Sequence, residues 1–368
     1  MPDEKIINRT IDLFEDVFPD DNKYIILLWD NSNSGKYVER NKNIYYVNFK
    51  NKKFWQIVGD VNKYESIVVH YLSTQSASFL NKIVHPRVYW IEWGGDLYET
   101  FLDYKGFKLY IDEKIISKVI YGNIPYFLYK FGKKLKRMNQ MKLLSSAVTK
   151  VRYFVPDSMF DEYPLFLSYY PEFSHLEYRE FFYYPIDEIL GKDLINKTCS
   201  ENSIIIGNSC SFTGNHIDVL SKLKDLNINN KIIVPLSYSG NSRYKNKVIN
   251  YGNSIFGERF NPITQYLPLN EYNNLLLKAS FYLYGNLRQE AVGNILIALY
   301  LGGKVFLNSR NPLLNFYKNL GLIIFNMDEL SSESFNIRLS FTQIQTNRKI
   351  LLEQYSLSRL KLLVRNNF

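Results

Sequence analysis

Cysteine is scarce in this chain of 368 residues, since Cys199 and Cys210 are the only two. A disulfide scaffold is therefore excluded, and a reducing compartment is the expected location. No apolar run approaches the roughly 18 residues that a membrane-spanning helix needs. The first 21 residues are acidic and lack an apolar core, so we expect no signal peptide there.

Several catalytic and ligand-binding signatures are also missing. The chain has no D-x-D, Walker A, H-E-x-x-H or G-x-S-x-G motif and no paired C-x-x-C. Its four histidines are too scattered to indicate a zinc site; they are His70, His85, His175 and His216. We therefore expect no metal in the site.

Aromatic residues, by contrast, are abundant, at 16% of the chain, and apolar residues make up 46%. Burial of so many large side chains can offset the entropy of ordering the chain, which excludes a disordered protein. The length exceeds what one core usually supports and favours two domains.

The net charge of +9 is concentrated in one segment, residues 104–152. That segment has twelve basic residues and two acids, so its charge of +10 leaves −1 for the rest of the chain. It also contains eight aromatic residues. Basic and aromatic side chains together suit an anionic membrane surface, where each basic residue contributes about 1 kcal/mol. The expected membrane contacts are Lys130, Lys133, Lys134, Lys136 and Arg137.

Two other interpretations of this segment stay open. A solvated helical face whose aromatic residues belong to the core would have the same composition. Nucleic acid would also use basic and stacking side chains, but the chain carries no signature of a nucleic-acid-binding module. We expect no nucleic-acid partner.

Short apolar runs alternate with helical patterns along the chain. The runs are continuous rather than alternating, which is typical of parallel strands covered on both faces. Strands are expected at 24–29, 44–49, 66–72, 87–93, 203–209, 231–238, 280–285, 304–309 and 322–326. Helices are expected at 215–226, at 291–302 and after about residue 340. Two series of this kind predict two doubly wound α/β domains.

The expected division of the chain places the first domain at residues 1–185 and the second at 186–342, with a helical tail at 343–368. The segment from about 155 to 195 is rich in Pro, Tyr and Asp and has no clear period. We interpret it as the passage between the domains.

Ligands of open α/β sheets bind beyond the carboxyl ends of the strands, so the residues that follow each strand matter most. The loop of Gly207, Asn208 and Ser209 precedes a helix that begins near Asn215 and His216. Small residues allow a ligand close to the backbone, and a helix start offers free N–H groups to a diphosphate. The alternative is an ordinary turn in which Asn215 caps the helix.

A second candidate loop follows the strand at 280–285. Arg288 can neutralise phosphate, whereas Gln289 and Glu290 can bind sugar hydroxyls. Gly293 and Asn294 are poor helix formers in a first helical turn, which indicates close approach by a ligand. The alternative for Arg288 is a structural ion pair.

The strand at 87–93 leads into Trp93, Gly94, Gly95 and Asp96. A carboxylate at a strand end beside two glycines is suited to act as a general base or to bind a hydroxyl, with Glu92 as the second candidate base. His70 ends the neighbouring strand and would face the same cleft. Trp93 can stack on a sugar or pack in the core, and Asp96 can alternatively cap a helix.

Together these residues resemble the family of bacterial 4-acetamido-4,6-dideoxygalactosyltransferases, glycosyltransferase family 56. The resemblance covers about residues 66–330 and depends on the order of several short motifs. They are W-x-x-W-G-x-D-L-Y-E from Trp90, the strand ending in His70, G-N-S from Gly207 with His216–Ile217, V-P-x-x-Y with Pro235 and Tyr238, Arg288-Gln289 with Gly293, and L-N-x-x-N-P from Leu307.

The resemblance implies a GT-B glycosyltransferase, in which two Rossmann-like domains bind the acceptor and the donor respectively and no metal is required. The expected donor is a dTDP-linked 4-acetamido-4,6-dideoxyhexose or a related sugar, and the expected acceptor is a lipid-linked saccharide. The enzyme would lie peripherally on the cytoplasmic face of the inner membrane. A GT-B-like nucleotide-sugar epimerase and a non-catalytic, membrane-associated glycan-binding protein are the alternatives.

Overall fold

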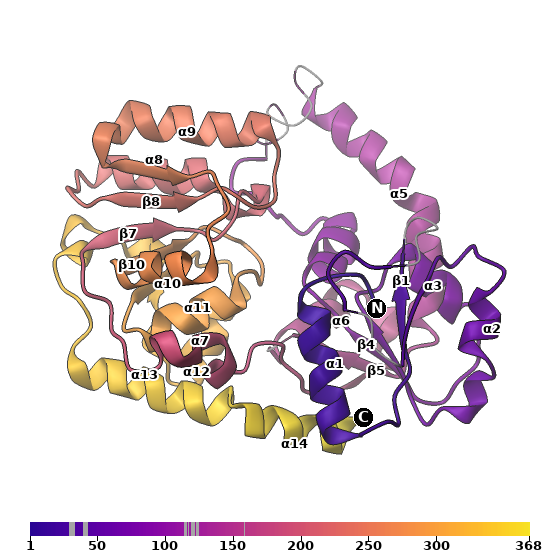
Figure 1. The fold of residues 1–368 in the computed structure, drawn as a ribbon. Helices are drawn as coiled ribbons and strands as arrows, with labels where there is room; N and C mark the ends of the chain where they lie inside the picture. Colours follow the sequence, from indigo (N-terminus) through magenta and orange to yellow (C-terminus); the bar gives the residue numbers. More distant parts are fainter. Residues whose placement is uncertain are drawn as a thin grey trace. The chain divides into compact units, whose positions relative to one another are not determined.

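The computed structural model describes residues 1–28, 34–39, 43–113, 116, 118, 122, 125–157 and 159–368. It divides into two compact units (Figure 1). Unit 1 comprises residues 1–107, 132–183 and 358–368, and unit 2 comprises residues 108–131 and 184–357. Trp29, at the end of an expected strand, and Lys114 and Tyr121 of the basic segment lie outside the described residues.

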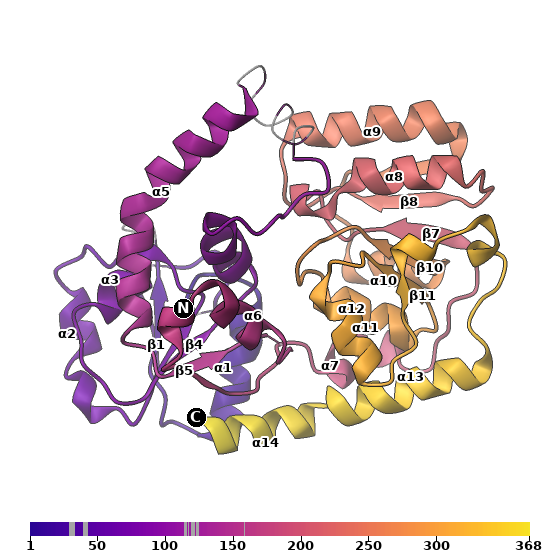
Figure 2. The ribbon, with the colours of Figure 1, turned by 180° about the vertical axis from the view of Figure 1, so that it is seen from behind.

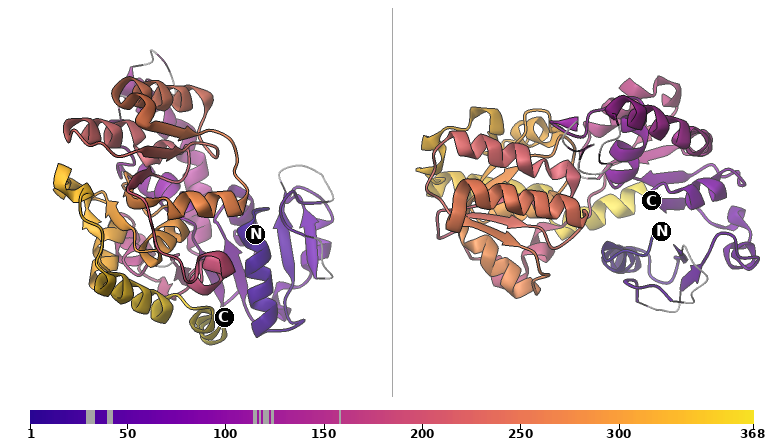
Figure 3. Two further views of the ribbon diagram at one scale, coloured as in Figure 1. Left: turned by 60° about the vertical axis from the view of Figure 1, so that its left-hand side comes forward. Right: turned by 90° about the horizontal axis from the view of Figure 1, so that it is seen from above.

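Unit 1 contains two parallel sheets. The strands β1 (Tyr24–Leu27) and β2 (Ile44–Val47) pair with each other (Figure 3). A second sheet has the order β3-β4-β5-β6. Its strands are β3 (Ile67–His70), β4 (Val88–Ile91), β5 (Tyr153–Val155) and β6 (Glu177–Tyr178). The apolar runs at 66–72 and 87–93 thus form adjacent parallel strands, as expected.

Helices complete unit 1, and aromatic side chains fill its core. Phe166 of α6 packs on Trp90 of β4 and Phe154 of β5. Figure 2 shows α6 beside these two strands. The last residue, Phe368, packs on Phe14 of α1, so the C-terminal helix belongs to this unit. The helices are α1 (Ile6–Val17), α2 (Phe54–Val58), α3 (Thr74–Leu80), the π-helix η2 (Gly95–Leu102), α5 (Tyr126–Val148), α6 (Glu162–Tyr169) and α14 (Leu357–Asn367). The start of α5, up to residue 131, belongs to unit 2.

Unit 2 contains one six-stranded parallel sheet with the order β12-β11-β10-β7-β8-β9. The strands are β7 (Ser203–Ile206), β8 (Ile232–Pro235), β9 (Phe260–Ile263), β10 (Ala279–Tyr284), β11 (Lys304–Leu307) and β12 (Phe325–Asn326). The helices are α7 (Ile186–Leu194), α8 (His216–Asp225), α9 (Ser242–Phe256), α10 (Leu269–Leu277), α11 (Val292–Tyr300), α12 (Pro312–Asn319) and α13 (Phe341–Gln354).

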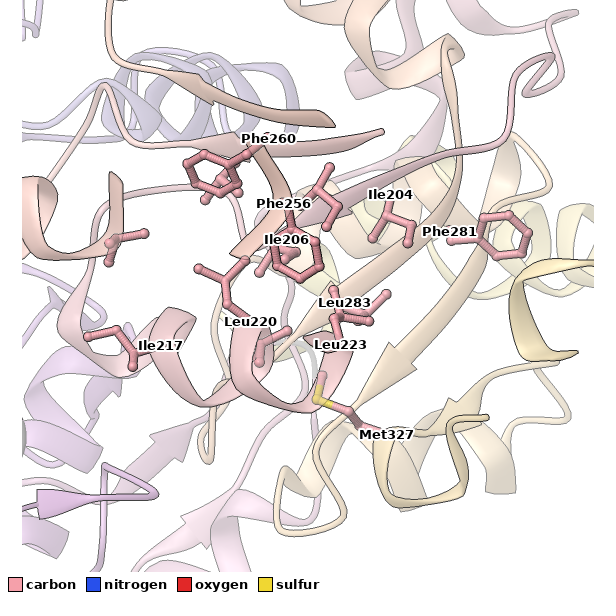
Figure 4. Packing of buried hydrophobic residues seen from close by; sticks show 14 of the residues in the cluster. Ile204, Ile206, Ile217, Leu220, Leu223, Phe256, Phe260, Phe281, Leu283 and Met327 are labelled. Atoms are coloured by element: carbon pink, nitrogen blue, oxygen red, sulfur yellow. The ribbon is translucent and has the colours of Figure 1, made fainter. Parts of the chain in front are cut away.

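The continuous apolar runs of unit 2 are buried on both faces of its sheet. Ile204, Ile206 and Leu283 point into one layer with Leu220 of α8 and Phe256 of α9 (Figure 4). On the other side, α11 packs against α7 and α13. This is the doubly wound arrangement that the sequence predicts.

The chain passes from unit 1 to unit 2 between residues 183 and 184, inside the segment 155–195 that we interpret as the passage between the domains. This segment is nevertheless not without regular structure, because α6, β6 and the start of α7 form there. Strand β9 and helices α9 and α10 were also not expected. Strands β5 and β6 have three and two residues, and segments so short carry no period that a sequence pattern can show.

Candidate active site

The strand order of unit 2 reverses between β7 and β10, which are paired neighbours. In an open α/β sheet the loops diverge at such a switch point and leave a crevice at the carboxyl edge, where ligands bind. The two loops that leave these strands are residues 207–215 and 285–291. Both of the expected donor-binding loops therefore lie at the switch point.

Small residues allow these two loops to approach each other closely. A Cβ on Gly285 would come within 2.6 Å of the Gly214 carbonyl oxygen, so no larger residue fits at this position. The amide of Asn215 donates to the Gly285 carbonyl at 2.9 Å and to the Thr213 carbonyl at 2.9 Å. Its Oδ1 accepts from the backbone of Ile111 at 3.0 Å. Asn215 thus joins the loops and is not a side-chain cap of α8, contrary to the alternative interpretation.

Helices α8 and α11 both begin after a residue in the left-handed conformation. Asn215 has φ 49° and ψ 38°, and Ala291 has φ 64° and ψ 23°, and neither side chain caps its helix. A left-handed alanine costs roughly 1 kcal/mol or more, and such strain is found mainly at functional sites. Two helix starts with their positive dipole ends therefore lie at one switch point.

Charged and amide side chains converge within the second loop. Glu290 accepts hydrogen bonds from Thr213 and from Asn286 at 2.6 Å, and it pairs with Arg288 at 3.2 Å. Arg288 is only 7% exposed and also donates to the Gln289 carbonyl at 2.7 Å. Asn286 is buried, and its Oδ1 has no hydrogen-bond partner among the described residues. Arg288 is thus in an ion pair, as its alternative interpretation expects, and a guanidinium at this edge also suits an anionic ligand. The unpartnered Asn286 Oδ1 is an acceptor, so it suits a hydrogen-bond donor of a ligand.

Other expected donor-binding residues have structural partners. The His216 ring is fully buried, and its Nδ1 lies 3.1 Å from the Tyr244 hydroxyl. A Cβ on Gly207 would approach His216 Nε2 at 3.0 Å, so the glycine leaves room for the ring. Burial lowers the pKa of His216 to about 4, and the imidazole is neutral near pH 7. His216 therefore supports the Gly207–Ser209 loop from inside.

The remaining donor-side residues lie at the same carboxyl edge. A Cβ on Gly293 would meet the Tyr184 ring at 3.1 Å, so this ring, and not a ligand, fills the space beside Gly293. Asn294 accepts from the Tyr272 hydroxyl at 2.7 Å. Pro235 ends β8 and is buried, whereas Tyr238 is 66% exposed.

The carboxyl edge of unit 1 is organised by Asp96, which has no exposed surface. Its Oδ2 accepts from Trp90 Nε1 and from the backbone of Leu72, both at 2.7 Å, and its Oδ1 accepts from the backbone of Trp93 at 2.8 Å. Burial raises the pKa of Asp96, an effect that these hydrogen bonds oppose. The carboxylate thus ties the loops that follow β3 and β4 to each other.

The expected neighbour His70 is connected to Trp93 through a residue that the sequence patterns did not identify. The Tyr183 hydroxyl lies 2.6 Å from His70 Nδ1 and accepts from Trp93 Nε1 at 2.5 Å. Burial lowers the pKa of His70 to about 3, so this imidazole is neutral. Trp93 is half-buried and its ring lies 5.9 Å from that of Tyr71. Tyr183 lies in the Tyr-rich segment without a period, which gave no signal for it.

The second candidate base, Glu92, is part of a buried carboxyl cluster. It accepts from the backbone of Gly94 at 2.5 Å and from that of Asp157 at 3.1 Å. Burial and the charge of Asp96 raise the pKa of Glu92 to about 8, although the hydrogen bonds from Gly94 and Asp157 oppose this shift. Glu162 is fully buried beside Glu92, and burial and this neighbour raise the pKa of Glu162 as well. Glu92 is therefore mainly protonated at pH 7.

The expected membrane contacts all fall on α5. Arg137 donates to the carboxylate of Asp103 and to the carbonyls of Glu99 and Thr100, and Lys133 pairs with Asp103 at 2.7 Å. These two residues join the helix to the end of η2, and their expected membrane contact stays a prediction. Large apolar side chains of the same helix are exposed; they are Phe127, Leu128, Phe131, Leu135 and Met138. Lys130, Lys134 and Lys136 are exposed on the same helix, and Lys130 also pairs with Glu113 at 2.7 Å.

In the described part of the chain, no three His, Cys, Asp or Glu residues are grouped so that they could hold a metal ion. None of its described helices combines the length and the apolar character that crossing a membrane requires.

Solved structures with the same architecture are GT-B glycosyltransferases. A UDP-forming α,α-trehalose-phosphate synthase from Burkholderia xenovorans matches with a TM-score of 0.58 and 10% identity over 97% of this chain and 94% of that one. Sucrose-phosphate synthase from Thermosynechococcus elongatus matches with a TM-score of 0.52 and 9% identity over 92% and 86%. HepE from Anabaena, solved with UDP-glucose, matches with a TM-score of 0.50 and 10% identity over 81% and 77%.

At such low identities these likenesses show the fold, which is GT-B with two Rossmann-like domains. The family model described as 4-alpha-L-fucosyltransferase, glycosyl transferase group 56, matches residues 166–353, just over half of the chain. The chain therefore belongs to this family of glycosyltransferases.

Proposed function

We propose that this enzyme transfers a 4-acetamido-4,6-dideoxyhexose, or a related sugar, from a dTDP-linked donor to a lipid-linked saccharide in surface polysaccharide synthesis. The observation that carries the donor side is the switch point of unit 2. Helices α8 and α11, which lack side-chain caps, begin there after the adjacent strands β7 and β10, and the guanidinium of Arg288 lies in the second of the two loops. Both features favour a diphosphate.

The donor edge supplies positive charge where the bond between the sugar and the diphosphate breaks. Negative charge develops on the nucleoside diphosphate as the bond to the sugar breaks. Hydrogen-bond donors that the protein already holds in position stabilise this charge without reorganisation. Each such hydrogen-bond donor increases the rate roughly 10²- to 10³-fold. Helix dipoles and Arg288 fill this role in our proposal, which supports a reaction that does not depend on a metal.

The carboxyl edge of unit 1 is the proposed acceptor side. The half-buried ring of Trp93, with Tyr71 and the small residues Gly94 and Gly95 beside it, suits the apolar face of a sugar. Because Asp96 has no exposed surface, we assign it the positioning of Trp93. The alternative is that Asp96 accepts a proton, with His70 nearby. The pH dependence of turnover in an Asp96 variant distinguishes the two roles.

The lipid-linked acceptor requires a membrane surface, and α5 is the proposed contact. Phe131 is 64% exposed, Leu135 is 53% exposed, and both are flanked by lysines. An apolar stripe bordered by lysines inserts into the interface of anionic lipids. We therefore propose a peripheral location on the cytoplasmic face of the inner membrane.

A thermal-shift panel of nucleoside diphosphates tests the donor. Stabilisation by dTDP and not by UDP, GDP or ADP is expected, because ligand binding to the folded state raises its stability. A response to none of them contradicts the proposal and favours a glycan-binding protein. Release of free nucleoside diphosphate from a dTDP-sugar without any acceptor would instead indicate an epimerase.

A further inference from the structure

A glutamate at the start of α6 is buried and has no part in the proposed chemistry. Glu162 is the first residue of this helix and has no exposed surface. In the part of the chain that the structure describes, no backbone or side-chain N–H group donates to either of its carboxyl oxygens. The cost of burying an unpaired charge far exceeds the stabilisation from the dipole of an eight-residue helix. Glu162 is therefore neutral in the folded chain.

The titratable groups that face Glu162 are two acids and a tyrosine. Glu92 follows β4, Asp157 follows β5, and Tyr98 lies on η2. Burial and then the charge of Glu92 raise the pKa of Glu162 well above its usual range. Asp157 adds to this shift and Tyr98 opposes it, while Asp96 at the start of η2 raises the pKa of Glu92. Because two carboxyl groups in contact do not both ionise, the pair of Glu92 and Glu162 holds a proton near pH 7.

The other contacts of these two side chains give the direction of the hydrogen bond between them. Each oxygen of Glu92 accepts one backbone N–H, from Gly94 at 2.5 Å and from Asp157 at 3.1 Å. Such bonds stabilise a charge on Glu92, whereas no described N–H group stabilises a charge on Glu162. A carboxyl oxygen has two lone pairs, so Glu92 can accept one bond more. Glu162 is therefore the proton donor of the pair and Glu92 the acceptor.

We infer that Glu162 keeps its proton across the neutral pH range and donates it in a hydrogen bond to Glu92, which positions the loop of Trp93. Glu162 is thus a positioning residue that acts on Trp93 through Glu92. The inference rests on the proposed function only in that this loop belongs to the proposed acceptor side.

Two series of contacts lead from Glu92 to Trp93. The first passes through the backbone of Gly94, the residue next to Trp93. The second begins at the backbone of Asp157, whose Oδ1 accepts from the backbone of Tyr183 at 3.3 Å. The Tyr183 hydroxyl then accepts from the indole of Trp93. Loss of the proton donor to Glu92 should therefore loosen the loop and the ring together.

Denaturant unfolding of wild type and Glu162→Gln tests the proton. Glutamine has the shape of a protonated glutamate and keeps an N–H donor for Glu92, but it cannot ionise. Above about pH 4.5 the unfolded wild type releases this proton, whereas the folded wild type retains it. The folding equilibrium constant of wild type should therefore fall about tenfold per pH unit relative to that of the variant, or about 100-fold from pH 5.5 to 7.5. A ratio that stays constant over this range means that Glu162 is ionised in the folded chain, and it overturns the inference.

Glu177→Gln is the matched control, because Glu177 is a half-buried glutamate on β6 of the same unit. Arg152 pairs with it at 2.9 Å and lowers its pKa, so Glu177 is ionised in the folded and unfolded chains from pH 5.5 upward. Its variant should differ from wild type by a constant amount over the tested range. The same pH trend in both variants would also overturn the inference, since that trend would not come from Glu162.

Amide hydrogen exchange at pH 7 tests the positioning role. Glu162→Leu removes the donor, so the amides of Gly94 and Asp157 should exchange at least about 5-fold faster than in wild type. Glu162→Gln restores a donor and should restore the wild-type rates. Equal protection of these amides in all three proteins overturns the positioning role. The unfolding comparison uses only the isosteric glutamine, so it stays decisive if the leucine variant does not fold.

Neither test uses a substrate, which separates this inference from the proposed function. Failure of both tests leaves the proposed function standing. A wild-type protein that binds no nucleoside diphosphate contradicts the proposed function, but it does not affect the hydrogen bond between Glu162 and Glu92.

Discussion

The amide nitrogen of Asn215 lies 2.9 Å from the carbonyl oxygen of Gly285, so a single side chain joins the loops of the two strands at the switch point. The same residue adopts the left-handed conformation at the start of α8. The strain of this conformation is offset by three hydrogen bonds to buried or half-buried backbone groups. The donor edge is therefore held together before any ligand binds.

Replacement of Asn215 should separate the two loops. Asn215→Ala removes the three hydrogen bonds and keeps the strain, so the free energy of unfolding should fall by about 3 kcal/mol. Asn215→Gly removes the same bonds but relieves the strain, and it should be about 1 kcal/mol more stable than the alanine variant. Denaturant unfolding measures both values. Equal stability of the two variants would contradict the assigned role of the backbone conformation.

Arg288→Ala should lower turnover at least about 100-fold, because it removes positive charge from the leaving diphosphate. Arg288→Lys keeps the charge but loses the planar fork, so its turnover should lie between those of the alanine variant and wild type. Steady-state kinetics with varied donor gives kcat and KM separately. Arg338→Ala is the control, since Arg338 contacts Ser200 and Asn202 at the opposite edge of the same sheet. Comparable losses in both alanine variants would contradict the assignment.

Asp96→Asn should affect both stability and activity. An amide cannot accept all of the hydrogen bonds that the carboxylate accepts from Leu72, Trp90 and Trp93, and one opposed buried donor costs about 1–3 kcal/mol. We expect a lower midpoint of thermal unfolding and at least about 100-fold lower turnover. A positioning role leaves the pH dependence of kcat unchanged, whereas the loss of the fall in kcat at low pH identifies a proton acceptor. Near-normal turnover in a folded variant would exclude both roles.

Sequence patterns were sufficient for the strands that dominate both sheets. The runs at β3, β4, β7, β8, β10 and β11 are continuous and apolar because helices or loops cover both faces, and this signal is local. The rule that ligands bind beyond strand ends then indicated Gly207, Arg288 and Asp96. All three lie at carboxyl edges in the structure.

Contacts between residues that are far apart in the sequence could not be predicted from local patterns. Asn215 and Gly285 are 70 residues apart, and His70 and Tyr183 are 113 residues apart, so no local period connects them. The sequence also did not show which side chains of α5 contact the rest of the protein. Lys133 and Arg137 are basic like the neighbouring residues of α5, so the sequence does not distinguish them. Only the position of Asp103 shows that these two side chains form ion pairs within the protein.

Acid should destabilise the protein through its two buried, neutral histidines. Burial lowers the pKa of His70 to about 3 and that of His216 to about 4, against about 6.5 when unfolded. Below pH 6.5 the unfolded chain therefore binds protons that the folded chain does not, so the free energy of unfolding decreases as pH falls toward 4. Each histidine contributes up to about 1.4 kcal/mol per pH unit.

Denaturant unfolding of wild type and His216→Phe between pH 7.5 and 4.5 checks this expectation. The phenylalanine ring fills the space beside Gly207 but loses the contact with Tyr244, so the variant should be less stable at pH 7.5. Its stability should fall less steeply with acid, because one titrating group is gone. Parallel pH dependences for the two proteins would show that His216 is not buried in the neutral form.

The exposed apolar stripe of α5 predicts binding to anionic vesicles. The double variant Phe131→Ser/Leu135→Ser removes two exposed apolar side chains, each worth roughly 1.5–3 kcal/mol when fully buried, and should reduce the partition coefficient at least about 10-fold. The double variant Lys130→Gln/Lys134→Gln should also have a lower partition coefficient than wild type. This difference between variant and wild type should disappear at high salt, because the attraction is electrostatic. Phe341→Ser is the control, since Phe341 is 77% exposed but lies on α13. Co-sedimentation with vesicles that contain or lack anionic lipid measures each effect, and equal binding by the α5 variants and the control would exclude this helix as the membrane contact.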